Sequence, residues 1–385
     1  MTMQRFGKSA QYLLLGCLLL FALIACQRED SAGEETAVSP DPNLSLYGGN
    51  IQRTGVYHTK AIRESEGVKW QFQTGDWIFT TPAVQNKTVY FGSYDGNLYA
   101  VDTNSGTEKW HFTTGDIVIS SPAVADGIVY FGGMDGNFYA LDASNGTERW
   151  RFNVGAAITS SPVVWQNRVY FGSDDGNVYA IAADTGREIW RFNTGAVVAF
   201  SPAIYQNSLY IGNSSGTLYV IDLDSGEEQW RFQTDGSVSA GPVIADDTIF
   251  LVTADPRLTG RLYAIDTNSQ QLLWLFQIPA ESYAPPAVAN GLVYVAGLDG
   301  FLYAINTKNG VERWRFATGG PIFSAPIIVE NMVYFGGWDQ YLYAVNAVTG
   351  REQWRLWAGS GVSSPVISDG VIYVGSDQGV LFAIH

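Results

Sequence analysis

Cysteine and histidine are scarce in this sequence, with two Cys and three His among 385 residues. Cys17 lies inside an apolar N-terminal stretch and Cys26 follows it, so residues 27–385 hold no thiol. This excludes disulfides, thiolate metal sites and Cys nucleophiles from that part of the chain. His58, His111 and His385 form neither a ligand pair by spacing nor a Ser–His–Asp set, which argues against these kinds of catalysis.

A long apolar run is also missing. The stretch from Tyr12 to Ile24 has 13 residues, whereas a membrane-spanning helix needs about 20. With Arg5 and Lys8 before it, the stretch predicts a secretory signal over residues 1–25. Leu23-Ile24-Ala25-Cys26 is similar to a bacterial lipobox, so we expect acyl chains on Cys26 to hold the protein to a membrane. The alternative is an ordinary signal peptide that is cut nearby.

The segment that follows predicts a tether and suggests a location. Residues 26–45 are polar, acidic and Ser/Pro-rich, and we expect them to be flexible. Gln27 stands where an Asp would retain a lipoprotein in the inner membrane. We therefore expect the outer membrane if the cell has one, and otherwise the outer face of the cell membrane.

Basic charge is in short supply. The formal net charge is −15, from 22 Lys and Arg against 37 Asp and Glu. Removal of the signal with Arg5 and Lys8 would bring it near −17. The negative charge argues against nucleic acid as a partner, because phosphate binding depends on Lys and Arg. Direct adsorption to anionic lipid is disfavoured for the same reason. We expect the membrane to be reached through the lipid anchor only, and the chain to be a monomer.

Tryptophan is plentiful and strictly spaced. Eight Trp residues follow one another at intervals of 40 residues with a single step of 44: Trp70, Trp110, Trp150, Trp190, Trp230, Trp274, Trp314 and Trp354. A Pro series from Pro82 to Pro365 and a series of Tyr residues from Tyr99 to Tyr343, completed by Phe382, each recur once per unit with almost the same spacing. Three such series indicate eight copies of one structural unit over residues 46–385.

Each unit predicts four short antiparallel strands. In the third unit an apolar strand follows Ser161-Pro162, a turn falls at Gln166-Asn167, and Asp175-Gly176 suits a tight hairpin. Four strands per ~40 residues are typical of a propeller blade. We therefore predict an all-β, eight-bladed β-propeller in which the eight Trp side chains dock each blade on the next, with each indole N–H bonded to the next blade's backbone.

The ends of the series predict how the ring closes. Trp70 precedes the first Pro of the series, whereas no Trp follows Pro365. The last unit thus lacks its outermost strand, and the segment around 68–72 is an outer strand without a blade of its own. We predict that it pairs with the last three strands, around 363–385, because unpaired edges at both ends would be exposed.

The repeat resembles that of the pyrroloquinoline-quinone-like (PQQ-like) propellers. Their signature, Ala-x-Asp-x-x-Thr-Gly-x-x-x-Trp, is matched best by Ala140, Asp142, Gly146 and Trp150. The resemblance covers residues 46–385. It implies the propeller fold strongly and a function only weakly. Two branches are similar in layout: the quinoprotein dehydrogenases, and the envelope lipoproteins of BamB type that assist β-barrel assembly.

The dehydrogenase branch implies a quinone over a Trp floor, a vicinal Cys pair, and Ca²⁺ held by acidic and amide side chains. None of these residues can be matched here: there is no Cys pair, and the innermost strands carry no charge. Since Ca²⁺ needs about six oxygen ligands, we expect neither PQQ nor Ca²⁺, no metal, and no catalytic residue. The Asp-Gly pairs recur once per unit and so predict turns rather than a carboxylate site.

A partner should bind where the units differ. Two loop types that propeller topology places on one face carry bulky side chains: Trp77, Phe79, Tyr94, Met134, Phe200, Tyr283, Phe323 and Trp338. They predict a protein-binding face; the alternative is that they fill the central channel. The fifth unit has four extra residues between Val252 and Arg261, which should extend the same face.

These observations favour a non-enzymatic, lipid-anchored envelope scaffold that binds envelope proteins, similar to the BamB-type lipoproteins. Two alternatives remain open: a PQQ-binding quinoprotein, either a dehydrogenase or a quinone sensor, and an envelope sensor of a small ligand. The sequence does not identify the partner or the type of cell envelope.

Overall fold

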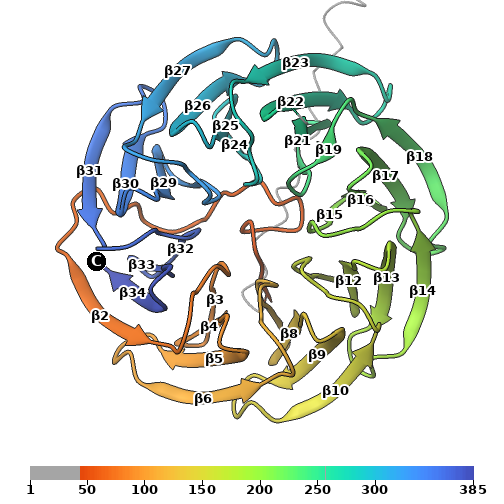
Figure 1. Ribbon diagram of the computed structural model, residues 1–385, viewed down its shortest axis with the longest axis vertical. Coiled ribbons are helices and arrows are strands. Elements are labelled where there is room, and N and C mark those ends of the chain that lie inside the picture. Colours follow the sequence, from red (N-terminus) through yellow and green to blue (C-terminus); the bar gives the residue numbers. More distant parts are fainter. Residues whose placement is uncertain (1–43, 256) are drawn as a thin grey trace, which may run out of the picture. The chain divides into compact units, whose positions relative to one another are not determined.

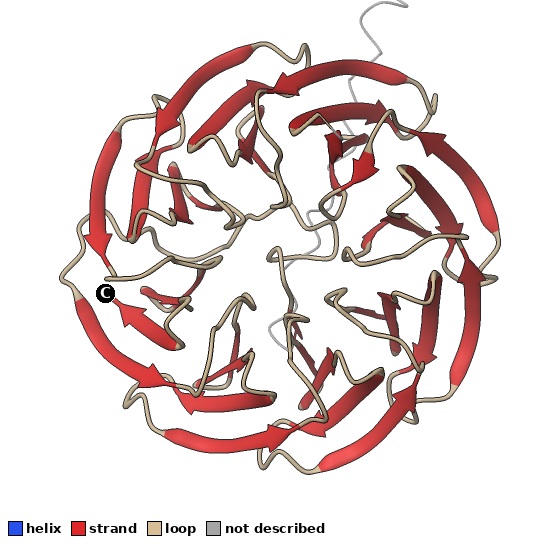
Figure 2. Cartoon of the chain, in the orientation of Figure 1, coloured by secondary structure: helices blue, strands red, loops and turns tan. Residues whose placement is uncertain are grey.

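The computed structural model describes residues 44–255 and 257–385, whose regular secondary structure is entirely β-strand (Figure 2). These residues form eight antiparallel sheets around one axis (Figure 1). The prediction of an all-β, eight-bladed propeller is therefore confirmed. The expected signal segment 1–25, Cys26 and the tether as far as residue 43 lie outside the described residues. No helix in the described ranges is both long and apolar enough to cross a bilayer.

Each blade starts with a short apolar strand beside the axis. These innermost strands are β3 (Ala83–Gln85), β7 (Ala123–Ala125), β11 (Val163–Trp165), β15 (Ala203–Tyr205), β20 (Val243–Ala245), β24 (Ala287–Ala289), β28 (Ile327–Val329) and β32 (Val366–Ser368). A two-residue turn leads to the next strand. In the third blade Gln166 and Asn167 both have positive φ, as a type I′ hairpin requires.

The two middle strands of each blade are buried on both faces because neighbouring blades cover them. The second strands are β4 (Thr88–Gly92), β8 (Ile128–Gly132), β12 (Arg168–Gly172), β16 (Ser208–Gly212), β21 (Thr248–Asp255), β25 (Leu292–Ala296), β29 (Met332–Gly336) and β33 (Val371–Val374). The third strands are β5 (Asn97–Asp102), β9 (Asn137–Asp142), β13 (Asn177–Ala182), β17 (Thr217–Asp222), β22 (Thr259–Asp266), β26 (Phe301–Asn306), β30 (Tyr341–Asn346) and β34 (Val380–Ile384).

The outermost strands alternate exposed and half-buried side chains, as expected at the rim. They are β6 (Glu108–Thr113), β10 (Glu148–Asn153), β14 (Glu188–Asn193), β18 (Glu228–Gln233), β23 (Leu272–Ile278), β27 (Glu312–Ala317), β31 (Glu352–Trp357) and β2 (Val68–Gln73). Blade 1 comprises β3–β6, and the later blades follow in chain order. The short strand β19 (Ser237–Val238) pairs with β21 at the edge of blade 5.

The ring closes as the ends of the repeat series predict. Blade 8 has the strand order β2-β34-β33-β32, so the first outer strand completes the last blade. The register pairs Gln71 with Phe382 and Phe72 with Leu381. Figure 1 shows β2 beside β34 and the C-terminus. The predicted pairing of the segment around 68–72 with the last strands is therefore confirmed.

The core lies between blades rather than within them. One cluster combines Tyr90 and Leu98 of blade 1 with Phe131, Tyr139 and Leu141 of blade 2. The Trp side chains line the outer part of these contacts. Trp110 and Trp190 are buried, whereas the other six are half-buried. At about 25 cal/mol per Å² of apolar surface, each docked indole contributes roughly several kcal/mol gross.

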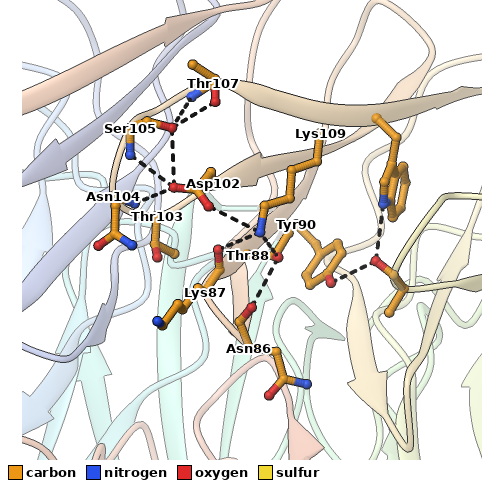
Figure 3. Close-up of polar contacts among 12 residues, drawn as sticks. Asn86, Lys87, Thr88, Tyr90, Asp102, Thr103, Asn104, Ser105, Thr107 and Lys109 are labelled. Atoms are coloured by element: carbon orange, nitrogen blue, oxygen red, sulfur yellow. Dashed lines mark hydrogen bonds and ion pairs between the residues drawn. The ribbon is translucent and has the colours of Figure 1, made fainter.

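The turn between the third and outer strands explains the family signature (Figure 3). Asp102 Oδ1 accepts the N–H groups of Asn104 and Ser105 at 3.0 and 3.1 Å. Those bonds lower the pKa of Asp102 to about 2. The Lys109 ammonium lies 3.3 Å from the other carboxylate oxygen. The Asp of the signature thus fixes the turn.

The Gly and Trp of the signature meet across blades. Gly146 has a φ of +71°, and a Cβ there would lie 2.6 Å from the indole of Trp110. The indole N–H of Trp110 donates to the Ala143 carbonyl at 3.1 Å. Bonds with the same 33-residue offset occur for Trp70, Trp150, Trp190, Trp274 and Trp314. Glycine is thus needed because the indole of the preceding blade lies directly on the turn.

Candidate functional site

Two kinds of loop meet on one face of the propeller. Because the strands of a blade alternate in direction, the hairpins between second and third strands project from the same face as the links between blades. The two are tied together: the Tyr94 N–H donates to Trp77 O at 2.9 Å, and the Trp338 N–H donates to Pro321 O at 3.0 Å. The bulky side chains on this face are therefore held on fixed backbone.

Five of the eight predicted face residues form one cluster, the aromatic patch: Trp77, Phe79, Tyr94, Phe323 and Trp338. The Trp77 ring centroid lies 5.6 Å from that of Phe79 and 5.8 Å from that of Tyr94. Phe79 lies 6.1 Å from Trp338, which lies 4.6 Å from Phe323. Sequence comparison found these residues one by one, whereas the fold joins them across blades 7, 8 and 1.

The aromatic patch is open to solvent. Trp77 is 41% exposed and Trp338 is 36% exposed, while the other three rings are half-buried. Burial and the nearby Asp76 carboxylate raise the pKa of Tyr94. A rigid, partly exposed group of aromatic rings is the arrangement found at the centre of many protein interfaces.

The other predicted face residues lie outside this patch. Met134 and Phe200 are half-buried, and Tyr283 is 42% exposed. Within the described ranges no ring contact joins Phe200 or Tyr283 to the patch; both line a separate groove. Phe200 and Tyr283 therefore belong to a second region of the predicted face, on other blades.

Sequence comparison missed Trp357. This side chain is 63% exposed at the end of β31, and its indole N–H donates to Gln340 Oε1 at 3.2 Å. Equivalent outer strands end in polar residues such as Asn153 and Asn193. The sequence did contain a signal for this residue, since Trp357 stands at a repeat position that is polar in these other units.

The chain's own lead-in, residues 44–62, begins along the axis and then runs outward to β2 at the rim (Figure 1). β1 (Leu44–Ser45) pairs with β7. Four central N–H groups of innermost strands then donate to four lead-in carbonyls at 2.8–3.1 Å, those of Ile51, Gln52, Thr54 and Gly55. Ile62 O ends the segment by accepting the Trp354 indole N–H at 2.9 Å. The lead-in thus satisfies backbone groups that face the channel.

Arg53 is the centre of this lead-in. Its guanidinium, 2% exposed, donates to the carbonyls of Tyr47 and Ser161 at 2.9 and 3.0 Å, and also to those of Pro162 and Pro202. Burial lowers the pKa of Arg53 to about 10, so it remains a cation at neutral pH. The backbone of Arg53 has a φ of +59°. Residues other than glycine adopt this left-handed conformation at a cost in free energy.

The Asp-Gly carboxylates have turn roles. Asp95 accepts the Tyr99 hydroxyl and the Gly75 N–H, each at 2.8 Å, and the Asn97 N–H at 3.0 Å. The Tyr-to-Asp bond recurs at the Asp-Gly residues Asp135, Asp175 and Asp299, and also at Asp339, which Gln340 follows. Among the described residues no group of three or more His, Cys, Asp or Glu is placed to hold a metal. His111 instead lies 2.7 Å from Glu108 on the rim.

Comparison with known proteins agrees with this geometry. A family model described as "Beta-alanine-activating enzyme, beta-propeller" matches residues 59–291, and one described as "Outer membrane protein assembly factor BamB" matches residues 258–385. The fold and these matches define a PQQ-like β-propeller with a BamB-like layout. The chain belongs to the propeller family of the first model, which covers more than half of its length.

Solved structures from both branches share the fold. BamB from Moraxella catarrhalis has a TM-score of 0.73 at 15% identity, over 84% of this chain and 100% of that one. The quinohemoprotein alcohol dehydrogenase of Comamonas testosteroni has a TM-score of 0.78 at 17% identity, over 95% and 83%. A europium-containing methanol dehydrogenase gives 0.74 at 18% identity, over 87% and 89%. No curated protein sequence matches the chain.

The residues around the cavity beside Arg53 do not fit a quinone with its cation. The cavity beside Arg53 is about 10 Å³, the size of a single water. Among the described residues that line it, Arg53 alone is charged, and its positive charge disfavours Ca²⁺. The rest are Tyr, Thr, Ser, Gly, Ala, Ile and Pro, which supply no carboxylate ligand. A separate hollow of about 740 Å³ lies along residues 56–60 of the lead-in, with Glu330 and Asp369 among its lining residues.

Proposed function

We propose that this protein is a non-enzymatic scaffold of the bacterial envelope, anchored by lipid on Cys26, that binds partner proteins through the aromatic patch. The observation that carries the proposal is the set of five contacting rings, partly exposed and held on hydrogen-bonded loops. Aromatic side chains in such settings lose little conformational entropy on binding and bury large areas.

Two further observations support a binding role. Residues 258–385, about the last third of the chain, match the model of an outer membrane protein assembly factor, and a solved BamB shares the fold over its whole length. The channel that could hold a ligand is filled by the lead-in and the buried cation Arg53. These observations favour recognition by the surface of the propeller over ligand binding in the cavity beside Arg53.

The test is co-purification of the full-length protein with envelope proteins from its own cells. We expect the Trp77→Ala/Trp338→Ala variant to lose the partner while its melting temperature stays within a few degrees of the parent. Trp165→Ala is the matched control. Trp165 is half-buried and is the last residue of the innermost strand β11, so it lies at the face opposite to the links between blades. An undiminished partner band in the double variant would refute the role of the patch.

The alternative hypothesis is that the protein is a PQQ-binding quinoprotein, because dehydrogenases of that class share the fold. Its test is a thermal melt with PQQ and Ca²⁺ added to the purified protein. A ligand at 100 times its dissociation constant stabilises a protein by about 2.7 kcal/mol. We expect an unchanged melting temperature; a rise of several degrees would favour the quinoprotein.

A further inference from the structure

A groove of about 770 Å³ lies on the same face as the aromatic patch but over blades 4, 5 and 6. Its walls include Phe200, Ser214, Asp235, Asp255, Glu281 and Tyr283. Phe200 and Tyr283 come from links between blades, Ser214 from the hairpin of blade 4, and Asp255 from the extended hairpin of blade 5. The volume is in the range of ligand-binding sites in proteins.

Two departures from the repeat create this groove. Blade 4 has the small Ser214 at the hairpin position that holds Tyr94 in blade 1 and Trp338 in blade 7. Blade 5 has the only insertion, and its hairpin strands continue to the pair Asp255 and Thr259. β19 pairs with the extended part through Ser237 and Ala254. The groove therefore has a small side chain, Ser214, in the wall from blade 4. The opposite wall is the extended hairpin of blade 5, to which β19 is hydrogen-bonded.

The charge of the groove has one sign. Three of its lining residues are the carboxylates Asp235, Asp255 and Glu281, and none of its lining residues is Lys or Arg. Arg261 stands behind the wall, 3.1 Å from Asp255 and 3.7 Å from Asp235. Arg261 offsets one of the three negative charges, mainly that of Asp255, which lies closer to it and is 9% exposed. Glu281 and the exposed side of Asp235 retain negative charge for a ligand.

The aromatic walls narrow the class of ligand. Tyr283 is 42% exposed beside Glu281, and Phe200 is half-buried across the groove. An aromatic face next to a carboxylate suits an ammonium or guanidinium group with an aliphatic stem, which gains cation–π, ionic and apolar contacts together. A bare metal ion would instead need converging oxygen ligands, and the described residues contain no such grouping.

We propose that this groove binds a Lys or Arg side chain on an extended segment of a partner protein. The inference rests on the proposed function, which it deepens by naming the chemistry of the partner: a basic segment, complementary to the groove in charge. The aromatic patch and the groove then form two separate contacts on one face, one apolar and one ionic.

The probe is the synthetic peptide acetyl-Leu-Lys-Leu-Lys-Leu-amide, titrated into the full-length protein by calorimetry at low salt. Its counterpart with Glu in place of Lys is the peptide control. We expect binding of the Lys peptide only, weakening as salt is added because the contact is ionic and partly exposed. In spectra of Ala-methyl-labelled protein, we expect the Ala254 signal to shift.

The variant Asp235→Asn/Glu281→Gln should bind the Lys peptide about tenfold more weakly, since two partly exposed ion pairs are lost. Asp116→Asn/Glu148→Gln removes the same charge elsewhere and should bind within about twofold of the parent. Glu281→Lys should reverse the preference toward the Glu peptide, which keeps the test valid if the double variant unfolds. Equal binding of both peptides, or equal losses in both double variants, would overturn the proposal.

The outcomes separate this inference from the proposed function. Trp77→Ala/Trp338→Ala should bind the Lys peptide normally, because the patch lies on other blades. If that variant loses its partner while the groove variants bind the peptide like the parent, the groove fails alone. If the peptide binds in the groove but the Trp variant keeps its partner, the aromatic patch fails alone.

Discussion

At the scale of single residues, the repeat is maintained by contacts that cross from one blade to the next. Gly146 lies under the Trp110 indole, whose N–H bonds to Ala143 three residues before that glycine. The Trp side chain of one unit thus requires a glycine in the turn of the following unit. This explains why Gly and Trp recur together at fixed spacing.

Gly146→Ala should be destabilised by about 2–4 kcal/mol, from the left-handed backbone of a non-glycine residue and the displaced indole. Gly127→Ala is the matched control: its φ is +75°, and its Cβ would meet nothing within 4 Å. It should lose only about 1–2 kcal/mol. Urea denaturation of both variants measures the difference, and equal losses would show that the indole contact adds nothing.

Acid should weaken the turns at the same scale. The pKa of Asp102 falls to about 2 through the Ser105 and Asn104 N–H groups, and that of Asp142 falls to about 2 mainly through the Ser144 hydroxyl. Because the folded pKa is below the unfolded one, this stability is present above about pH 4 and lost as the pH falls toward 2.

Asp102→Asn should lower the dependence of the melting temperature on pH between 5 and 2. The asparagine is compatible with the fold, since Asn346 accepts the corresponding N–H groups in blade 7 at 3.1 and 2.9 Å. Asp116→Asn, outside these turns, is the control. A pH profile of Asp102→Asn that matches the parent's would contradict the assigned role of the carboxylate.

At the scale of elements, the sequence predicted the repeated strands and the closing strand but not the lead-in. Repeated positions can be compared eight times, whereas residues 44–62 occur once. Arginine is usually found at the protein surface, so nothing in the sequence indicated that Arg53 is buried. Its burial is favourable only because the surrounding carbonyls accept its N–H groups. Non-repeated segments lack the comparison that made the blades predictable.

The lead-in gives the element-scale prediction. Arg53→Met should lose about 2–4 kcal/mol of unfolding free energy, because buried carbonyls lose their donor. Arg63→Met is the control. Arg63 directly follows the lead-in, is exposed and lies 2.7 Å from Glu330, and its replacement should cost about 0–1 kcal/mol. Urea denaturation again measures both. Equal stabilities would show that the guanidinium does not hold the channel.

At the scale of the whole molecule, the candidate site was only partly predictable. Comparing units located the bulky residues of the face, since Tyr94 and Trp338 stand where blade 3 has Asp174. That Trp338 contacts Phe79 depends on ring closure, which brings blade 7 within one blade of the first. The groove depends on a small side chain in the hairpin of blade 4 and a longer hairpin in blade 5, and only the fold shows that these two features lie side by side.

The whole-molecule claim is that this propeller recognises proteins through one face. The most direct measurement is photo-crosslinking in the source cells, with benzoyl-phenylalanine placed at Trp338 and, as control, at Trp165. We predict a discrete adduct with an envelope protein from position 338, absent from position 165 and lost when Trp77→Ala is added. No adduct from position 338, or the same adduct from both positions, would contradict the account.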